Sequence, residues 1–485
     1  MSGGTWTQLK NGCTVFDINK FLNEKRACLV APAGYGKTHA IVECLKAAPS
    51  RQLVLTHTHA GVASLKDKIA HAGIPSAKYE LLTIAAFAQR LAIAYTNPND
   101  GSIPSVVNSQ SFFIWEIMRA QKLAECKFIA DMIALSYRGI IVDEYQDCTI
   151  TQHGLIMTLA ERLPLRVFGD PMQGIFGFKE PIIDFDVHLS EFTRYQLTVP
   201  HRWSQTNPRL GHEIADVRSQ LCRRQPLDFS RFLEIKHVTL SIQDYQNYLL
   251  KLCSSWRKEG TTVVIVSNPI SREARIGVAR LFNGGCSIVE AIDDKEFYEL
   301  AQQVDALTKN KVEKVFYEIA CVLFFKTGVD AWMTPNGVIN KRDEKKRIIA
   351  KALSDALETL KENPTANNFR ESLRVAAKLP NVVLLKHEKW FSLMSALQSA
   401  DINGETVFDA MVRERNMVRG MGRKILRFAV GTTLLTKGLE FDNVIVLNSG
   451  QKFALNTDSG RRHFYVAVSR ARKKLCIMDI AKDIP

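Results

Sequence analysis

The stretch Ala31-Pro32-Ala33-Gly34-Tyr35-Gly36-Lys37-Thr38 restricts the fold of this chain more than any other part of the sequence. It follows the apolar run Ala27–Val30 and precedes the apolar-periodic segment His39–Ala47, so we expect a buried strand, a glycine loop and a helix. Such a loop points backbone N–H groups at an anion, and the helix dipole favours the negative charge. The sequence therefore predicts a phosphate-binding loop in an α/β sheet.

Residue types inside this loop suit a nucleotide. Gly34 and Gly36 would let the backbone approach the phosphates, Lys37 would reach the β- and γ-phosphates, and Thr38 would ligate Mg²⁺. The first glycine of the usual pattern is replaced by Ala31, so a plain strand-to-helix loop that happens to contain Gly-Lys-Thr is the alternative. The predicted nucleotide-binding residues of the loop are Ala33, Gly34, Tyr35, Gly36, Lys37 and Thr38.

Length and charge bound the remaining possibilities. A chain of 485 residues is longer than one hydrophobic core usually supports, so we expect two or more domains. The formal net charge of +14 indicates a polyanionic partner such as nucleic acid, or else only well-solvated surfaces. Ten cysteines are scattered singly without a C-x-x-C pair, which predicts neither a zinc site nor a disulfide framework. We find no signal core and no apolar run long enough for a membrane span, and expect a cytoplasmic protein without membrane contact.

A second candidate feature is the apolar run Gly139–Val142, which ends in the adjacent acids Asp143 and Glu144. Beside a phosphate loop, Asp143 would hold Mg²⁺, and Glu144 would orient and deprotonate the water that attacks the γ-phosphate. The alternative is a strand followed by an ordinary acidic turn. The pairing with the phosphate loop favours the catalytic interpretation.

Three further apolar runs end in candidate functional residues. Leu165–Phe168 leads to Gln173, a candidate γ-phosphate sensor, and to Phe176 and Phe178, whose rings would either stack on bases or lie in the core. Leu197–Val199 reads as a strand that delivers Arg202. The strand Leu53–Thr56 runs into a polar loop containing His57, Thr58 and His59, for which a nucleic-acid contact fits better than a metal site, because no carboxylate or cysteine stands at ligand spacing.

Taken in order, these segments resemble the motifs of superfamily 1A helicases, the UvrD/Rep-like group. The match continues in 432–442 and 462–472, which makes seven motifs in the family's order. The resemblance implies two RecA-like lobes, ATP and Mg²⁺ as ligands, and movement on single-stranded DNA, in the 3′-to-5′ direction. By resemblance, His201 stands at a base-stacking position, and the nucleotide-site positions are Gly36, Lys37, Thr38, Asp143, Glu144, Gln173, Arg202, Gly438, Glu440 and Arg470. The implied nucleic-acid contacts are Thr56, His57, Thr58, Phe87, Phe176, Phe178, Thr432 and Lys437.

Departures from the family pattern concern the nucleic-acid positions. His57 replaces a stacking Phe, Thr83–Phe87 stands for T-x-H-S-F, and Leu434 replaces a His. The residues of the ATP site are therefore all present, whereas several residues that contact the nucleic-acid strand in the family are replaced. Two functions stay open: an ATP-dependent translocase or helicase, and a nucleic-acid- or nucleotide-sensing ATPase subunit that activates a partner nuclease in anti-phage defence without processive unwinding. The compact layout resembles the helicase-like subunit of the Gabija anti-phage system.

The predicted fold class is α/β, with two RecA-like P-loop lobes, each a parallel sheet flanked by helices, and reduced, mostly helical insertions. We expect the first lobe in 1–225 with a small insertion at about 77–135, the second lobe in 226–296 and 425–485, and a helical insertion in 297–424. Helices are predicted at Ala77–Leu91, Ser109–Leu135 and Arg272–Leu281, and a basic irregular stretch at Arg209–Arg231. Strands are predicted at His237–Leu240, Thr262–Ser267, Cys286–Val289, Phe428–Thr432, Asn443–Asn448 and Leu475–Met478.

Overall fold

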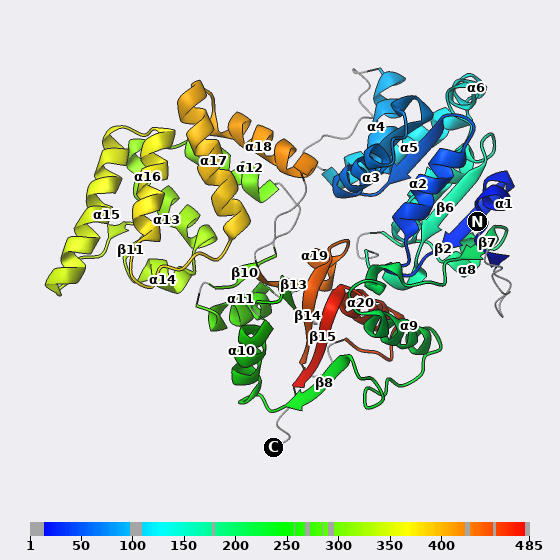
Figure 1. The fold of residues 1–485 in the computed structure, drawn as a ribbon. Coiled ribbons are helices and arrows are strands. Elements are labelled where there is room, and N and C mark those ends of the chain that lie inside the picture. Colours follow the sequence, from blue (N-terminus) through cyan, green and yellow to red (C-terminus); the bar gives the residue numbers. More distant parts are fainter. Residues whose placement is uncertain are drawn as a thin grey trace. The chain divides into compact units, whose positions relative to one another are not determined.

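The computed structural model describes residues 14–97, 109–176, 180–256, 258–266, 272–283, 285–289, 295–421, 427–449 and 453–480. The chain forms two compact units (Figure 1). The first unit comprises Met1–Lys236 and Phe453–Lys474, and the second comprises His237–Lys452 and Leu475–Pro485. Among the residues described, no helix is long and apolar enough to cross a membrane.

The first unit is built on a seven-stranded sheet in the order β1-β7-β2-β6-β5-β3-β4, whose neighbouring strands pair in parallel. Alternate side chains of β3 point to opposite faces of the sheet. Leu53 and Leu55 pack against the helices α4–α7, and Val54 packs against α2 and α3. Both faces are thus covered by helices, which explains why these strands read as unbroken apolar runs. The strands are β1 Thr14–Val15, β2 Arg26–Val30, β3 Gln52–Thr56, β4 Tyr79–Thr83, β5 Ile140–Val142, β6 Leu165–Gly169 and β7 Thr193–Gln196.

Helices of the first unit connect these strands and place the candidate residues at one edge of the sheet. Because β2, β5 and β6 run in parallel, the loops that follow them meet at the same carboxyl edge. The helices are α1 Ile18–Asn23, α2 Lys37–Ala47, α3 His59–His71, α4 Ile84–Ala94, α5 Ser109–Glu125, α6 Lys127–Ser136, α7 Ile150–Leu159, α8 Phe185–His188, α9 Pro208–Cys222 and α20 Asp458–Val468, with 3-10 turns η1 Ser76–Lys78, η2 Tyr145–Asp147, η3 Pro171–Gln173 and η4 His201–Trp203.

Three predictions of local structure in this unit are wrong. Residues Tyr79–Thr83 form a strand instead of the start of a helix, because they pair along the whole of β3, and the Thr83 side chain then caps α4. The predicted strand at Leu197–Val199 lies just beyond the end of β7, so Arg202 sits in the turn η4. The stretch 209–231 is not irregular throughout, because 208–222 form α9, capped by the Asn207 side chain with a proline in its first turn.

The second unit contains a six-stranded sheet in the order β10-β13-β9-β14-β15-β8. The neighbours β10, β13, β9 and β14 pair in parallel, and α10 and α11 pack on the sheet. Its elements are β8 Ile235–Leu240, α10 Tyr245–Trp256, β9 Thr262–Val266, α11 Arg272–Leu281, β10 Ser287–Ile288, β13 Phe428–Thr432, α19 Thr433–Thr436, β14 Phe441–Ser449 and β15 Ala471–Ile480. The strand and helix predictions for these segments are confirmed to within a few residues; Ser267 lies outside the described residues.

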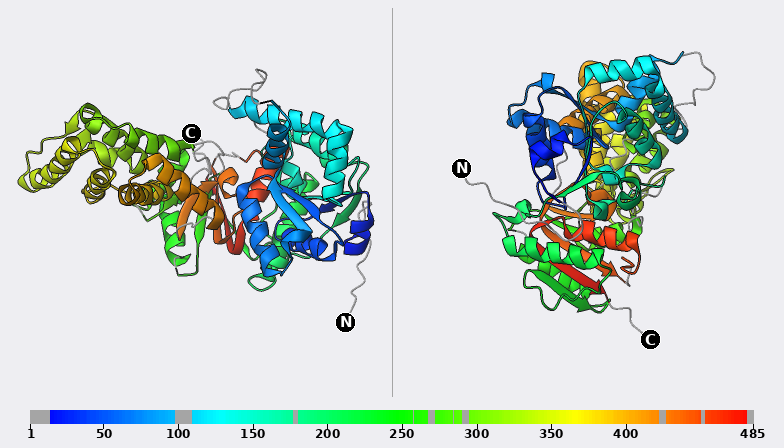
Figure 2. Two further views of the ribbon diagram at one scale, coloured as in Figure 1. Left: turned by 90° about the horizontal axis from the view of Figure 1, so that it is seen from above. Right: turned by 90° about the vertical axis from the view of Figure 1, so that its right-hand side faces the viewer.

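Between β10 and β13 the chain forms a helical segment with its own hydrophobic core (Figures 1 and 2). Phe316, Phe369 and Leu397 are among its fully buried side chains. Its elements are α12 Lys295–Asp305, α13 Val312–Leu323, α14 Lys326–Asp330, β11 Met333–Thr334, β12 Gly337–Val338, α15 Glu344–Glu362, α16 Ala366–Ala377, α17 His387–Asn403 and α18 Val407–Met421, with the 3-10 turn η5 Lys309–Lys311. The predicted fold class, two parallel α/β sheets with mostly helical insertions, is confirmed.

Candidate active site

The glycine loop between β2 and α2 has the backbone of a phosphate cradle. Gly34 and Gly36 have φ values of +78° and +92°, a region in which L-residues with side chains are strained. Gly36 caps the N-terminus of α2 and leaves the first N–H groups of that helix free of a side-chain cap. Ala31 does not have a positive φ, so its backbone does not require the glycine of the usual pattern.

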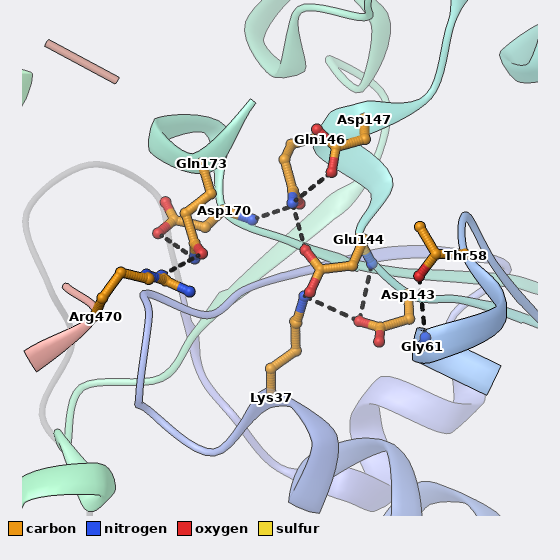
Figure 3. A network of polar contacts seen from close by, with 10 residues as sticks. All are labelled: Lys37, Thr58, Gly61, Asp143, Glu144, Gln146, Asp147, Asp170, Gln173 and Arg470. Carbon is orange, nitrogen blue, oxygen red and sulfur yellow. Dashed lines mark hydrogen bonds and ion pairs between the residues drawn. The ribbon is translucent and has the colours of Figure 1, made fainter. Parts of the chain in front are cut away.

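Lys37, Asp143 and Glu144 meet at the mouth of this loop (Figure 3). The Lys37 Nζ lies 3.0 Å from Asp143 Oδ1 and 2.5 Å from Glu144 Oε1. Burial alone would lower the pKa of Lys37, but the two carboxylates raise it above its usual value. The lysine therefore stays charged, and its ammonium is the cation that faces both acids.

Glu144 is held in an unusual backbone conformation. Its φ is +55°, in the left-handed region that costs a residue with a side chain free energy, and such conformations cluster at functional sites. Its N–H donates to Asp143 Oδ1 at 2.8 Å, and the Gln146 Nε2 donates to Glu144 Oε2. The Gln146 Oε1 in turn accepts from the N–H of Asp170 at 3.0 Å, which ties the acidic turn to the end of β6.

Gln173 and Arg470 lie together on the other side of this network (Figure 3). The Arg470 Nη2 donates to Gln173 Oε1 at 3.3 Å, and Gln173 Nε2 donates to Asp170 Oδ2 at 3.1 Å. Asp170 is fully buried and accepts from Arg218 at 2.7 Å. Burial would lower the pKa of Arg218, but the neighbouring Asp170 raises it above its usual value, so the guanidinium remains charged.

Arg202 and His201 belong to η4 and lie against the loop. The Arg202 N–H donates to Gly34 O at 2.8 Å. A Cβ added at Gly36 would lie 3.3 Å from the Cδ2 atom of the His201 ring. The Arg202 Nη1 donates to Ser469 O at 2.5 Å. The first unit thus brings together Lys37, Thr38, Asp143, Glu144, Gln173, His201, Arg202 and Arg470, which are far apart in the sequence.

Candidate nucleic-acid residues of the first unit have varied surroundings. Thr58 is exposed and caps α3 by accepting from Gly61 N–H, and His57 Nε2 lies 3.5 Å from Cys148 Sγ. Thr56 is buried at the end of β3. Phe176 is half-buried, and Phe178 lies outside the described residues.

Phe87 needs a correction. Its side chain is 3% exposed and packs in the core between α4 and the sheet. A side chain enclosed in this way is not available for the nucleic-acid contact that the resemblance implies, so Phe87 is a core residue in this structure.

The remaining candidates belong to the second unit. Thr432 is fully buried and caps α19 through its side chain, which accepts from Leu435 N–H at 3.4 Å. Gly438 has a φ of +80° and is exposed, and so is Glu440. Lys437 directly follows α19 and is half-buried.

Sequence reasoning missed several residues that shape the site. Gln146 and Asp170 stand within the motifs but carry no recognisable signal, because their role depends on a contact between two loops. Tyr465 is fully buried, and its hydroxyl accepts from the N–H of Ala33 at 3.0 Å. Trp203 is also fully buried and adjoins Gly34. An aromatic residue beside a candidate catalytic arginine is the one signal that could have pointed to Trp203.

The site offers oxygen ligands of the kind that Mg²⁺ prefers, but too few of them to hold a metal ion by protein side chains alone. Within the described ranges, no group of three or more His, Cys, Asp and Glu side chains forms a metal cage. Thr38 at the start of α2 and Asp143 at the end of β5 offer one hydroxyl and one carboxylate. Mg²⁺ is commonly held by one or two such groups plus phosphate oxygens and water.

Two family models match the sequence. Residues 17–179 match an AAA domain, and residues 429–478 match the UvrD-like helicase C-terminal domain. The search of curated proteins finds no match.

Solved structures give only distant similarity. The arterivirus nonstructural protein 10 helicase in complex with DNA has 11% sequence identity over 95% of this chain, with a TM-score of 0.36. The same arterivirus protein in a second crystal structure has 12% identity over 97% of the chain, with a TM-score of 0.33. The alignments span 63% of the arterivirus chain in both cases, and at this similarity they carry no argument about function.

Proposed function

We propose that this chain is a UvrD-like superfamily 1 helicase that hydrolyses ATP to move along single-stranded DNA in the 3′-to-5′ direction. The matches to an AAA domain and to the UvrD-like helicase C-terminal domain support a nucleic-acid helicase. The observation that carries the proposal is the joint placement of Lys37, Asp143 and Glu144 at the mouth of a glycine loop. A cation, a metal-binding carboxylate and a candidate base are the groups that phosphoryl transfer to water requires.

Each residue has a role in this chemistry. Backbone N–H groups of 33–38 bind the phosphates, and Lys37 exchanges its two carboxylate partners for the β- and γ-phosphate oxygens. Glu144, with one oxygen fixed by Gln146, accepts the proton of the attacking water through the other. Thr38 and Asp143 would hold Mg²⁺, which would supply positive charge to the phosphates.

Two arginines serve the charge that develops on the transferred phosphoryl group. The Arg470 guanidinium lies beside Gln173, and the main chain of Arg202 lies against Gly34, so both arginines belong to the surroundings of the site. A positioned guanidinium stabilises this charge in the transition state more than in the ground state. Gly438 and Glu440, from the second unit, are proposed as further nucleotide contacts by resemblance only.

We also propose the domain plan expected from the sequence: a first lobe in 1–225 with a small insertion at about 77–135, a second lobe in 226–296 and 425–485, and a helical insertion in 297–424. Nucleic-acid contacts are proposed at His57, Thr58, Phe176 and Lys437, which are at least partly accessible. The net charge of +14 supports a polyanionic partner.

A second candidate function is supported by the burial of Thr56, Phe87 and Thr432. With these side chains enclosed, few are left to grip a strand during each ATP cycle. A nucleic-acid- or nucleotide-sensing ATPase subunit, which would switch a partner nuclease in anti-phage defence, needs binding and hydrolysis but no processive unwinding.

ATPase rates with and without single-stranded DNA, together with strand separation on a 3′-tailed duplex, test both functions. We expect DNA-stimulated hydrolysis that Lys37→Ala abolishes. Glu144→Gln should bind ATP and hydrolyse it at least about 100-fold more slowly, whereas the exposed Glu161→Gln should behave as wild type. Unwinding supports the helicase, and stimulation without unwinding supports the sensor. Hydrolysis that DNA does not stimulate would exclude both the helicase and a sensor of nucleic acid.

A further inference from the structure

The turn that carries Arg202 is also hydrogen-bonded to the segment that carries Arg470. Four side-chain donors of residues 202–207 reach main-chain carbonyls of residues 469–473, in the same order along both segments. We call these four contacts the 202–207 clamp. They are Arg202 Nη1 to Ser469 O at 2.5 Å, Trp203 Nε1 to Ala471 O at 2.7 Å, Thr206 Oγ1 to Arg472 O at 3.0 Å and Asn207 Nδ2 to Lys473 O at 3.0 Å.

Trp203 is the buried centre of the clamp. Its side chain is fully enclosed, and the Arg202 guanidinium lies 5.3 Å from its ring centroid. A Cβ at Gly34 would come within 2.7 Å of the indole, and a Cβ at Gly211 within 2.9 Å of the Trp203 Cβ. One side chain therefore contacts the phosphate loop, α9 and the residue after Arg470.

The direction of the Arg470 side chain depends on this backbone. The side chain is 2% exposed, its Nε donates to Val466 O at 2.9 Å, and its Nη2 donates to Ser469 Oγ at 2.8 Å. These two partners are local and move with the segment, whereas Gln173, whose Oε1 also accepts from Nη2, lies in η3. Trp203 ties the segment to the phosphate loop through the hydrogen bond on the next carbonyl, that of Ala471, and through the contact of the same indole with Gly34; the Tyr465 hydroxyl, which accepts from the N–H of Ala33, is a second tie.

We propose that Trp203 is a positioning residue for Arg470: its indole N–H holds the Ala471 carbonyl, and its ring sets the distance from that segment to the phosphate loop. This inference rests on the proposed role of Arg470 in phosphoryl transfer. An arginine displaced by a fraction of an ångström still leaves ATP bound but meets the transition-state charge poorly.

Trp203→Phe tests the proposal, because it keeps a ring in the core and removes the N–H donor. We expect kcat to fall about 10-fold, with the affinity for a non-hydrolysable ATP analogue changed less than about 3-fold. The matched control is Trp332→Phe, in the helical segment, where a buried indole likewise donates to a carbonyl, that of Pro380, at 2.8 Å. The control should keep the wild-type kcat.

A double-mutant cycle with Arg470→Lys separates positioning from general support. If Trp203 acts through Arg470, Trp203→Phe should slow the Arg470→Lys enzyme less than about 2-fold. A full 10-fold loss in that background would overturn the proposal. So would a wild-type kcat for Trp203→Phe.

Thr206→Val is a second, milder probe, since it removes the neighbouring donor to Arg472 O from an exposed position. It should lower kcat in the same direction without changing analogue affinity, and it serves if Trp203→Phe does not fold. An unchanged kcat would then count against the clamp. If Arg470→Lys itself keeps wild-type turnover, the proposed role of Arg470 fails, and the failure is distinct from that of the clamp.

Discussion

Gly34→Ala is a direct test of how tightly the phosphate loop is built into the first unit. The added methyl group meets two separate obstacles. Gly34 has a φ of +78°, which disfavours any residue with a Cβ. The new Cβ would also lie 2.7 Å from Trp203 Cζ3 and 2.8 Å from Arg202 Cβ, inside van der Waals contact.

The magnitude follows from these two terms. A left-handed conformation costs an L-residue about 1–2 kcal/mol. Overpacking of a filled core costs about 1–3 kcal/mol more, because the indole is fully enclosed and cannot swing away. We therefore expect Gly34→Ala to lower the free energy of unfolding of the first unit by about 2–5 kcal/mol.

Gly73→Ala is the matched control for the backbone term alone. Gly73 lies in the same unit with a φ of +66°, and an added Cβ there would meet no atom within 4 Å. Its expected cost is about 1–2 kcal/mol, so the difference between the variants isolates the contact with Trp203. Urea unfolding monitored by tryptophan fluorescence, with equal m-values, gives this difference. Equal costs within about 0.5 kcal/mol would refute the close packing of the loop on Trp203.

Two further predictions concern ionisable groups of the first unit. Asp170→Ala removes the fully buried carboxylate that pairs with Arg218 and should lower the free energy of unfolding in urea by about 3–5 kcal/mol. The control Asp186→Ala removes an exposed partner of Arg194 and should lower it by under about 1 kcal/mol. Similar losses for the two variants would contradict the importance of the pair between Asp170 and Arg218. Burial and the neighbouring His188 lower the pKa of His153 from its usual value to about 4. As the pH falls, the imidazole is therefore protonated in the unfolded chain at a higher pH than in the folded chain. The free energy of unfolding should then fall as the pH drops from about 6.5 toward 4. His153→Gln should flatten that slope between pH 7 and 5, and an unchanged slope would show that other groups set it.

Catalytic candidates at strand ends could be found without a structure. The glycine loop, Asp143-Glu144 and Gln173 each follow an apolar run, and β2, β5 and β6 are those runs. Because parallel strands end at one edge of their sheet, recognising the runs was enough to expect the residues to converge.

Local patterns failed where partners far away in the sequence decided the structure. Residues 79–83 read as part of a helix, yet they pair with β3, since an available strand edge outweighs a weak helical propensity. The helix α9 was missed because residues 209–231 were read together as one basic stretch, although the buried Leu210, Ile214, Val217 and Leu221 recur at helical spacing. Phe87 stands at a nucleic-acid contact position by resemblance, but its side chain packs in the core.

By itself, the sequence determined the fold class and the chemistry of the loop, because periodicity and strand-end motifs are local properties. Only the tertiary structure decided how that chemistry is held in place. Trp203 donates to Ala471, and Tyr465 accepts from Ala33, across more than 260 residues in each case. Such contacts depend on which surfaces pack together, and that packing is a property of the whole core rather than of any segment.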